Sequence, residues 1–155
     1  MTDTSTSATT PAAPNIAALW RRLAAIIYDS FLVFAIWIVV GFFVMFALGV
    51  DQVKASEGLE PLHQWVLFFS QILSAVLFFG WFWTNSGQTL GMQAWRIKVE
   101  NLDGTPISWK QVLQRLAVAP FALALGGIGY WWSLFDKNKR SWPDLVSQSR
   151  IVKVK

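Results

Sequence analysis

An arginine and an aspartate at the start of a long apolar run are the residues whose types and spacing could do chemistry. Arg22 and Asp29 are seven residues apart, so on a helix they share one face, about 10 Å apart along the axis. A carboxylate near the start of a membrane span costs a few kcal/mol unless it is paired or hydrated. We therefore expect Asp29 to face the protein interior and to bind a base or another donor, with Arg22, Arg115 and Arg140 as the candidate bases.

The residue types present in the chain argue against most enzyme chemistry. The chain has no cysteine and a single histidine, His63, so zinc-thiolate sites, iron–sulfur clusters and cysteine nucleophiles are excluded. No histidine is available on the expected cytoplasmic side to activate Ser86, Ser108 or Ser141. The stretch Gly87–Gly91 lacks the lysine and hydroxyl ending of a phosphate-binding loop. We expect no enzyme activity, no cofactor and no metal site.

The composition is poorer in charged residues than that of a soluble domain. Of 155 residues, 54% are hydrophobic and 14% are charged, whereas soluble domains carry about 25% charged residues. The net charge of +4 is small and dispersed, which argues against nucleic acid as a partner. These values predict a small integral membrane protein with one domain.

Two long apolar runs predict two membrane-spanning helices, at residues 20–49 and 63–84. Ser30–Val50 and Trp65–Trp83 contain no charged residue, and about 20 apolar residues suffice to cross the hydrocarbon core. The first 15 residues are mainly Thr, Ser, Ala and Pro, so we predict a disordered tail at 1–15 ahead of a membrane domain at 16–155.

A third apolar segment, residues 112–135, is less regular because it contains Pro120 and the Gly126–Gly129 cluster. Lysine and arginine number two before the first run, one in the next loop, four in the following connection and six in the basic C-terminal tail at 136–155. Basic residues favour the cytoplasmic side, so these counts place both termini inside. A broken segment that enters and returns on one side satisfies every count, and the alternative is one kinked span.

Two short stretches predict a small cytoplasmic β element. Residues 94–108 contain an alternating apolar and charged run followed by a turn signal, Asn101–Gly104. Residues 150–154 are β-branched and basic. Each strand needs a partner, and the two can pair only if they lie on one face of the membrane.

Three blocks of the sequence resemble the RDD family of small bacterial membrane proteins. They are Arg21–Asp29 (RRLAAIIYD), Asn85–Ser108 (NSGQTLGMQAWRIKVENLDGTPIS) and Lys139–Val154 (KRSWPDLVSQSRIVKV). The resemblance covers residues 20–154 and implies a membrane fold with a shared polar cluster. It assigns Arg22, Asp29 and Asp144 to the arginine and two aspartates that give the family its name.

Two functions remain open for this cluster. The first is a structural link in an accessory membrane subunit of the bacterial inner membrane, which binds other membrane proteins or lipid, including anionic lipid. The alternative is an ion or small-solute transporter, for example a cation–proton exchanger, that works as an oligomer through Arg22, Asp29 and Asp144. We expect the N-terminus to be cytoplasmic in both cases.

Overall fold

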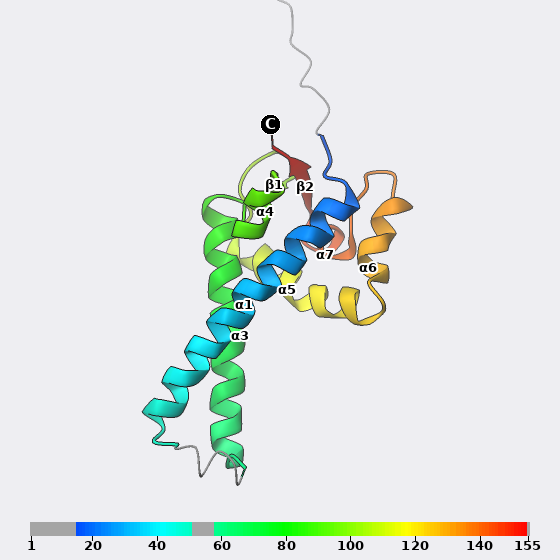
Figure 1. Ribbon diagram of the computed structural model, residues 1–155. Coiled ribbons are helices and arrows are strands. Elements are labelled where there is room, and N and C mark those ends of the chain that lie inside the picture. The colour runs from blue at the N-terminus through cyan, green and yellow to red at the C-terminus, as the bar shows by residue number, and fades with distance from the viewer. Residues whose placement is uncertain (1–14, 51–57, 155) are drawn as a thin grey trace, which may run out of the picture.

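The computed structural model describes residues 15–50 and 58–154, and most of them are helical (Figure 1). The predicted disordered tail falls outside the described residues except for Asn15. In chain order the elements are α1 (Leu19–Ala47), α3 (Pro61–Asn85), α4 (Leu90–Ala94), β1 (Ile97–Asn101), α5 (Trp109–Ala124), α6 (Ile128–Trp131), the 3-10 helix η1 (Trp132–Leu134), α7 (Trp142–Val146) and β2 (Ser149–Lys153).

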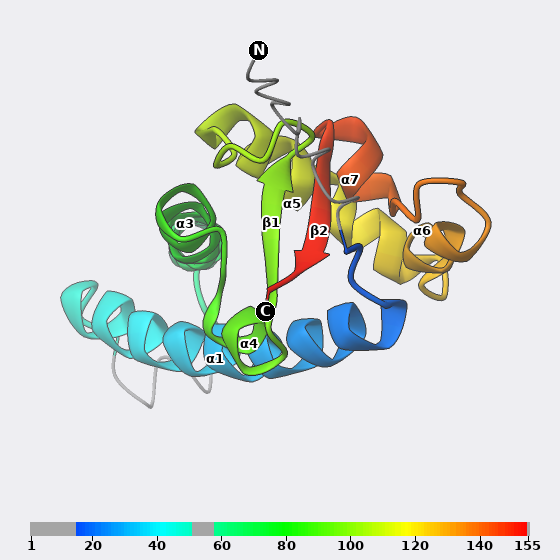
Figure 2. The same ribbon diagram turned by 90° about the horizontal axis from the view of Figure 1, so that it is seen from above.

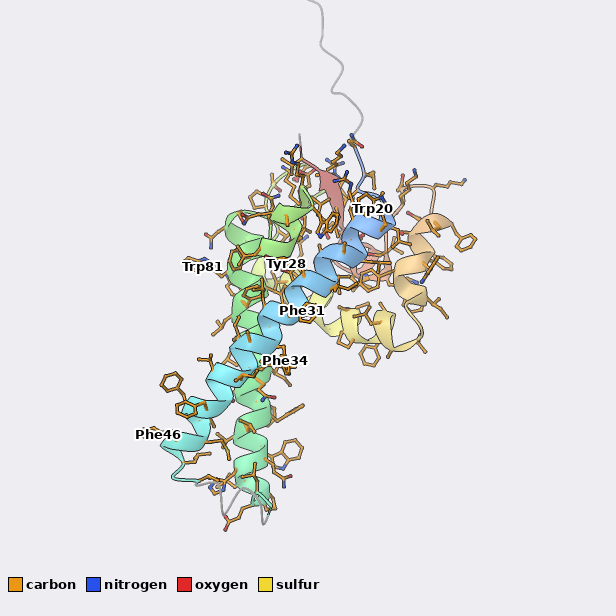
Figure 3. The ribbon with its side chains drawn as sticks, viewed as in Figure 1. Trp20, Tyr28, Phe31, Phe34, Phe46 and Trp81 are labelled. Atoms are coloured by element: carbon orange, nitrogen blue, oxygen red, sulfur yellow. The ribbon has the colours of Figure 1, made fainter. Side chains whose placement is uncertain are left out.

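The two long apolar helices predicted from the sequence are confirmed as α1 and α3, and both are long and apolar enough to cross a membrane. Their lower halves extend beyond the rest of the molecule (Figure 1). The large side chains along them point outward (Figure 3), with Phe31 72% and Phe46 77% exposed. Such a helix surface is typical of contact with lipid or with other membrane helices.

The third apolar segment is a bent pair of helices, as the sequence analysis allowed. The axis turns by 108° between α5 and the segment formed by α6 and η1. The bend lies at Gly126 and Gly127, whose φ angles of 65° and 76° are in the left-handed region that favours glycine. Pro120 lies inside α5 and does not end it, so the two glycines rather than the proline set the change of direction.

The predicted β element is confirmed as an antiparallel pair of strands. β1 and β2 are joined in a register that runs from Ile97 opposite Lys153 to Asn101 opposite Ser149. The residues before α1 lie against β2, because the Ala17 N–H donates to the Ile151 carbonyl at 2.9 Å. Seen from above, the two strands lie side by side with α3 and α6 on opposite sides of them (Figure 2).

The predicted strand stretch at residues 94–108 also contains parts that are not strand. Ala94 ends α4, and Arg96 has a φ angle of 51°, so the chain reverses there before β1 begins at Ile97. Ser108 then starts α5 with a capping box, in which its N–H donates to the Gln111 side chain at 2.8 Å. The strand that forms, β1, is therefore shorter than the stretch 94–108 predicted from the sequence.

The hydrophobic core lies at one end of the molecule, around the sheet. Its buried members come from the segment before α1, the first turns of α1, α4, both strands, the loop before α5 and α5 itself: Ala17, Ala25, Met92, Ile97, Val99, Ile107, Val112 and Ile151. We call this end the head, and define it as residues 15–29, 86–118 and 136–154. The head also contains the buried charged residues.

Candidate functional site

Asp144 is the centre of the buried charged cluster. It lies in the first turn of α7, where its Oδ2 atom accepts hydrogen bonds from the Ser141 N–H and hydroxyl at 3.0 and 2.8 Å. The Arg22 guanidinium binds the same oxygen at 2.7 Å, and the Arg115 guanidinium lies 2.8 Å from Oδ1. All three charged side chains are at least 95% buried. We call Arg22, Arg115 and Asp144 the charged cluster.

Arg22 uses its remaining donors to join segments that are distant in sequence. Its Nε donates to the Ala17 carbonyl at 3.1 Å, and a second guanidinium nitrogen donates to the Lys139 carbonyl at 3.0 Å. Hydrogen bonds from a charged donor are stronger than neutral ones. Arg22 therefore holds α1 to the chain before it and to the loop that leads into α7.

Arg115 makes the equivalent connection from α5. Its guanidinium donates to the Ser147 hydroxyl at 3.3 Å and to the Ser149 hydroxyl. Its charged carbon lies 5.3 Å from the centre of the Trp83 ring, within the range of a cation–π interaction. Arg115 thus links α5 to β2 and to the end of α3.

The pKa of Asp144 reflects this setting. Burial alone would raise it, but the charges of Arg115 and Arg22 and the hydrogen bonds from Ser141 outweigh burial, so the pKa lies below its usual range. The carboxylate is therefore ionised at neutral pH. A buried carboxylate that carries its charge and has partners for both oxygens is suited to holding elements together.

Asp29 occupies a separate site, in which its partners are neutral. Its Oδ2 accepts a hydrogen bond from the Thr89 hydroxyl, and its Oδ1 accepts one from the Gly91 N–H at 2.9 Å. Thr89 is also the N-cap of α4, because its hydroxyl accepts from the Met92 N–H at 3.2 Å. Asp29 is 4% exposed, and it docks α4 onto α1.

The close approach of α4 to α1 explains why residue 91 is glycine. A Cβ atom at Gly91 would lie 2.6 Å from the Ala25 carbonyl oxygen and 2.8 Å from Asp29 Oδ1. Both distances are too short for real contacts, and one of the atoms belongs to the backbone. The Gly91 N–H can reach Asp29 because no side chain intervenes.

None of the three candidate bases, Arg22, Arg115 and Arg140, forms an ion pair with Asp29 in the structure. Among the described residues no basic side chain forms an ion pair with Asp29, and Arg22 and Arg115 pair with Asp144 instead. Arg140 pairs with Asp136, at 3.6 Å on the exterior. The rise along α1 between positions 22 and 29 keeps Arg22 from Asp29, and α7 brings a nearer carboxylate.

Several residues of both sites were missed by sequence reasoning: Thr89, Gly91, Ser141, Ser147 and Ser149. The spacing Ser141–Asp144 is a capping pattern and could have been noticed. Gly87–Gly91 was weighed as a phosphate-binding loop, whereas its last residues bind Asp29. Nothing in the local sequence of Ser147 or Ser149 indicates a buried arginine as partner.

Two hollows lie near these sites. One, of about 740 Å³, is lined by Lys137, Lys139, Arg140 and Arg150 together with Asn15 and neighbouring residues. The other, of about 440 Å³, lies between α1, α3 and α5 and is bordered by Arg22, Asp29, Arg115 and Tyr130 among mostly apolar residues. Within the described part of the chain, no three His, Cys, Asp or Glu side chains gather in a way that could hold a metal ion.

Comparison with known proteins supports the resemblance noted in the sequence. The model of the RDD family matches residues 16–148, which include Arg22, Asp29, Asp144 and the elements that hold them. Neither the curated proteins nor the solved structures gave a match. Because the match covers most of the chain, this protein belongs to the RDD family.

Proposed function

We propose that the chain is an inner-membrane protein in which α1 and α3 span the bilayer and the head lies at the cytoplasmic face. The support is that three segments separated by apolar helices meet at one two-stranded sheet. The backbone before α1 pairs with β2 through Ile16 and Val152, and β2 pairs with β1. The bent pair of α5 and α6 connects these two strands, so in this arrangement it enters the membrane and returns on the same side.

The charge distribution favours the same orientation. All lysines and arginines among the described residues lie in the head. The described residues between α1 and α3 include one charged side chain, the acidic Glu60, and no lysine or arginine. Basic residues concentrate on the cytoplasmic side of membrane proteins. The N-terminus and both strands are therefore assigned to the cytoplasm.

Single cysteines test this topology directly, because the chain has none of its own. Ser86→Cys follows α3, Asn138→Cys follows the bent pair, and Glu60→Cys precedes α3, all at exposed positions. In oriented cells or vesicles, Ser86→Cys and Asn138→Cys should react with an impermeant maleimide from one side and Glu60→Cys from the other. Labelling of Ser86→Cys and Asn138→Cys from opposite sides would show that the bent pair is a complete span.

Within the membrane we propose a structural and binding role, that of an accessory subunit. The observation that carries this proposal is the position of Asp144 between two arginines. Its Oδ2 accepts hydrogen bonds from Arg22 and Ser141, and its Oδ1 lies 2.8 Å from the Arg115 guanidinium as an ion pair. The two guanidinium charges beside this carboxylate repel a passing cation. Large apolar side chains, by contrast, are exposed along α1 and α3 and are available to bind lipid or a partner's helices.

Cation–proton exchange through Arg22, Asp29 and Asp144 in an oligomer is the second candidate, favoured by one observation. Asp29 borders the 440 Å³ cavity, so a solute in that cavity would meet a carboxylate. Two or three helical segments in one copy are few for alternating access, and this function therefore requires several copies.

A flux assay separates the two functions. Purified protein is reconstituted into liposomes with a pH gradient, and dissipation by sodium or potassium is measured for wild type and for Asp29→Asn. The structural proposal predicts equal rates for both proteins and for empty liposomes, with an added ionophore to show that the gradient is intact. Flux that is abolished by Asp29→Asn, in protein that still inserts and folds, would support exchange and contradict the structural proposal.

A further inference from the structure

The cavity between α1, α3 and α5 has a shape that neither the charged cluster nor the spanning role explains. Its volume is about 440 Å³. Along α1 it is lined from Arg22 to Trp37, which at 1.5 Å per residue is about 22 Å. Dividing the volume by this length gives a mean cross-sectional area of about 20 Å². The cavity is therefore long and narrow, as a single extended hydrocarbon chain is.

The cavity is polar at one end and apolar at the other. Arg22, Arg115 and Trp83 line it near the head, together with Asp29, whose oxygens are bound to Thr89 and Gly91. Trp37 and Ala75 line it farther along α1 and α3. Trp83 lies at the end of α3 that joins the head, and Ala75 lies eight residues earlier. A ligand that matches this lining has a polar group level with the head and an apolar body that runs toward the middle of the spanning helices.

The polar end has two hydrogen-bond donors to offer. Arg115 Nε and Trp83 Nε1 are buried, and neither has an acceptor within the described residues. Arg115 is 4% exposed, and its guanidinium carbon lies 5.3 Å from the centre of the Trp83 ring, so the two side chains that carry these donors are neighbours. A buried donor without an acceptor is destabilising, and a ligand oxygen at this end would remove that cost.

We propose that this cavity binds one acyl chain of a phospholipid from the cytoplasmic leaflet, with an ester or phosphate oxygen accepting hydrogen bonds from Arg115 and Trp83. This inference rests on the membrane placement proposed above. The polar end of the cavity lies next to the head, which we place at the cytoplasmic face, so the headgroup of such a lipid would lie in the cytoplasmic leaflet. A lone ion would leave the apolar length of the cavity unfilled.

Phospholipid retained by the purified protein provides the test. Wild type and variants are washed extensively in mild detergent, and the bound lipid is identified and counted by native mass spectrometry. Ala75→Phe fills the cavity from α3, and Ala119→Phe fills it from α5. Ala35→Phe is the matched control, because Ala35 is exposed on α1 and does not line the cavity.

The site predicts one tightly retained phospholipid per chain in wild type and in Ala35→Phe, and at least a tenfold loss in each filled variant that elutes as a folded species. Two independent filling positions keep the test valid if one variant fails to fold. Trp83→Phe keeps the ring but removes one donor, and should weaken retention roughly three- to tenfold. Titration with inorganic phosphate alone should give no binding, since the acyl chain of the lipid supplies most of the contact with the cavity.

Equal retention by Ala75→Phe, Ala119→Phe and Ala35→Phe would overturn the assignment, as would wild type that retains no lipid while still requiring detergent for solubility. Binding of inorganic phosphate with the affinity of the phospholipid would also overturn it, because the apolar length would then be irrelevant. A protein that proved soluble without detergent would instead overturn the membrane placement on which the assignment rests. The two failures are thus distinguishable.

Discussion

The two buried aspartates are held in different ways, although each binds the start of a short helix: Asp144 within α7, and Asp29 across from α1 to α4. Asp144 is 0% exposed and lies between two arginines. Asp29 is 4% exposed and accepts from a hydroxyl and a backbone N–H. The first arrangement joins α1, α5 and α7, which are distant in sequence. The second docks one short helix, α4, onto α1.

The two arrangements differ in what is left behind when the carboxylate is removed. The charged cluster balances one negative charge against two positive ones inside the head, so removal of the aspartate leaves two buried guanidinium groups without a counterion. Removal of Asp29 leaves two neutral donors. Buried charges are more costly to leave unpaired than buried neutral groups, so the two positions should respond very differently to the same substitution.

Asp144→Asn should produce the largest effect. It keeps the size of the side chain and removes the charge that Arg22 and Arg115 share. We expect the free energy of unfolding to fall by about 3–5 kcal/mol, as for other buried pairs that lose one partner. Denaturant or thermal unfolding in detergent, followed by tryptophan fluorescence, measures it. A loss below about 1 kcal/mol would show that the arginines find other acceptors.

The pH dependence of stability should follow the same residue. Because the pKa of Asp144 is lower in the folded protein than in the unfolded chain, its contribution is complete above the unfolded value of about 3.9. That contribution is lost as the pH falls through the folded pKa, since the unfolded state then binds more protons. Wild type should therefore lose stability on acidification below about pH 4 more steeply than Asp144→Asn. Parallel curves for the two proteins would contradict this.

Gly91→Ala should have the next largest effect, on the Asp29 side of the comparison. The added Cβ meets the Ala25 carbonyl and Asp29, so α4 must move away from α1 and the Gly91 N–H must leave its acceptor. We expect a loss of about 2–3 kcal/mol, the range for overpacking of a tight contact. Gly41→Ala is the matched control, because a Cβ there would lie 3.8 Å from Leu67 and should be neutral or stabilising by up to about 1 kcal/mol.

Asp29→Asn should have the smallest effect of the three substitutions. The asparagine oxygen can still accept from the Gly91 N–H, and its NH₂ group can donate to the Thr89 hydroxyl. We expect a loss of about 1 kcal/mol in the same unfolding measurement, with Thr89→Val giving a similar value. A loss as large as that of Asp144→Asn would show that the charge of Asp29 matters and that the contrast between the two sites is mistaken.

Much of the framework could be predicted from the sequence, for identifiable reasons. Charge-free runs indicate α1 and α3, and the requirement that two isolated strands find partners predicts that β1 pairs with β2. The Gly126–Gly129 cluster indicates where the third segment bends. These features depend on local composition or on a count of charges, both of which are visible without a structure.

The partners of the buried charges could not be predicted in the same way. Asp29 binds residues about 60 positions later through α4, a helix of five residues that is too short to show a hydrophobic period. Asp144 was singled out through the family resemblance alone, and its own surroundings suggest nothing more than a helix cap. Which arginine meets which aspartate depends on how α5 and α7 pack, and that packing is a property of the whole head.

The central claim is that Asp144 holds the head together through its arginines, and a double-mutant cycle tests it most directly. The free energy of unfolding would be measured in detergent for wild type, Arg22→Met, Asp144→Asn and the double variant. We expect each single variant to lose about 3–5 kcal/mol and the double variant to lose much less than the sum of the two. Additive losses would contradict the account, because they would mean that Arg22 and Asp144 contribute to stability independently.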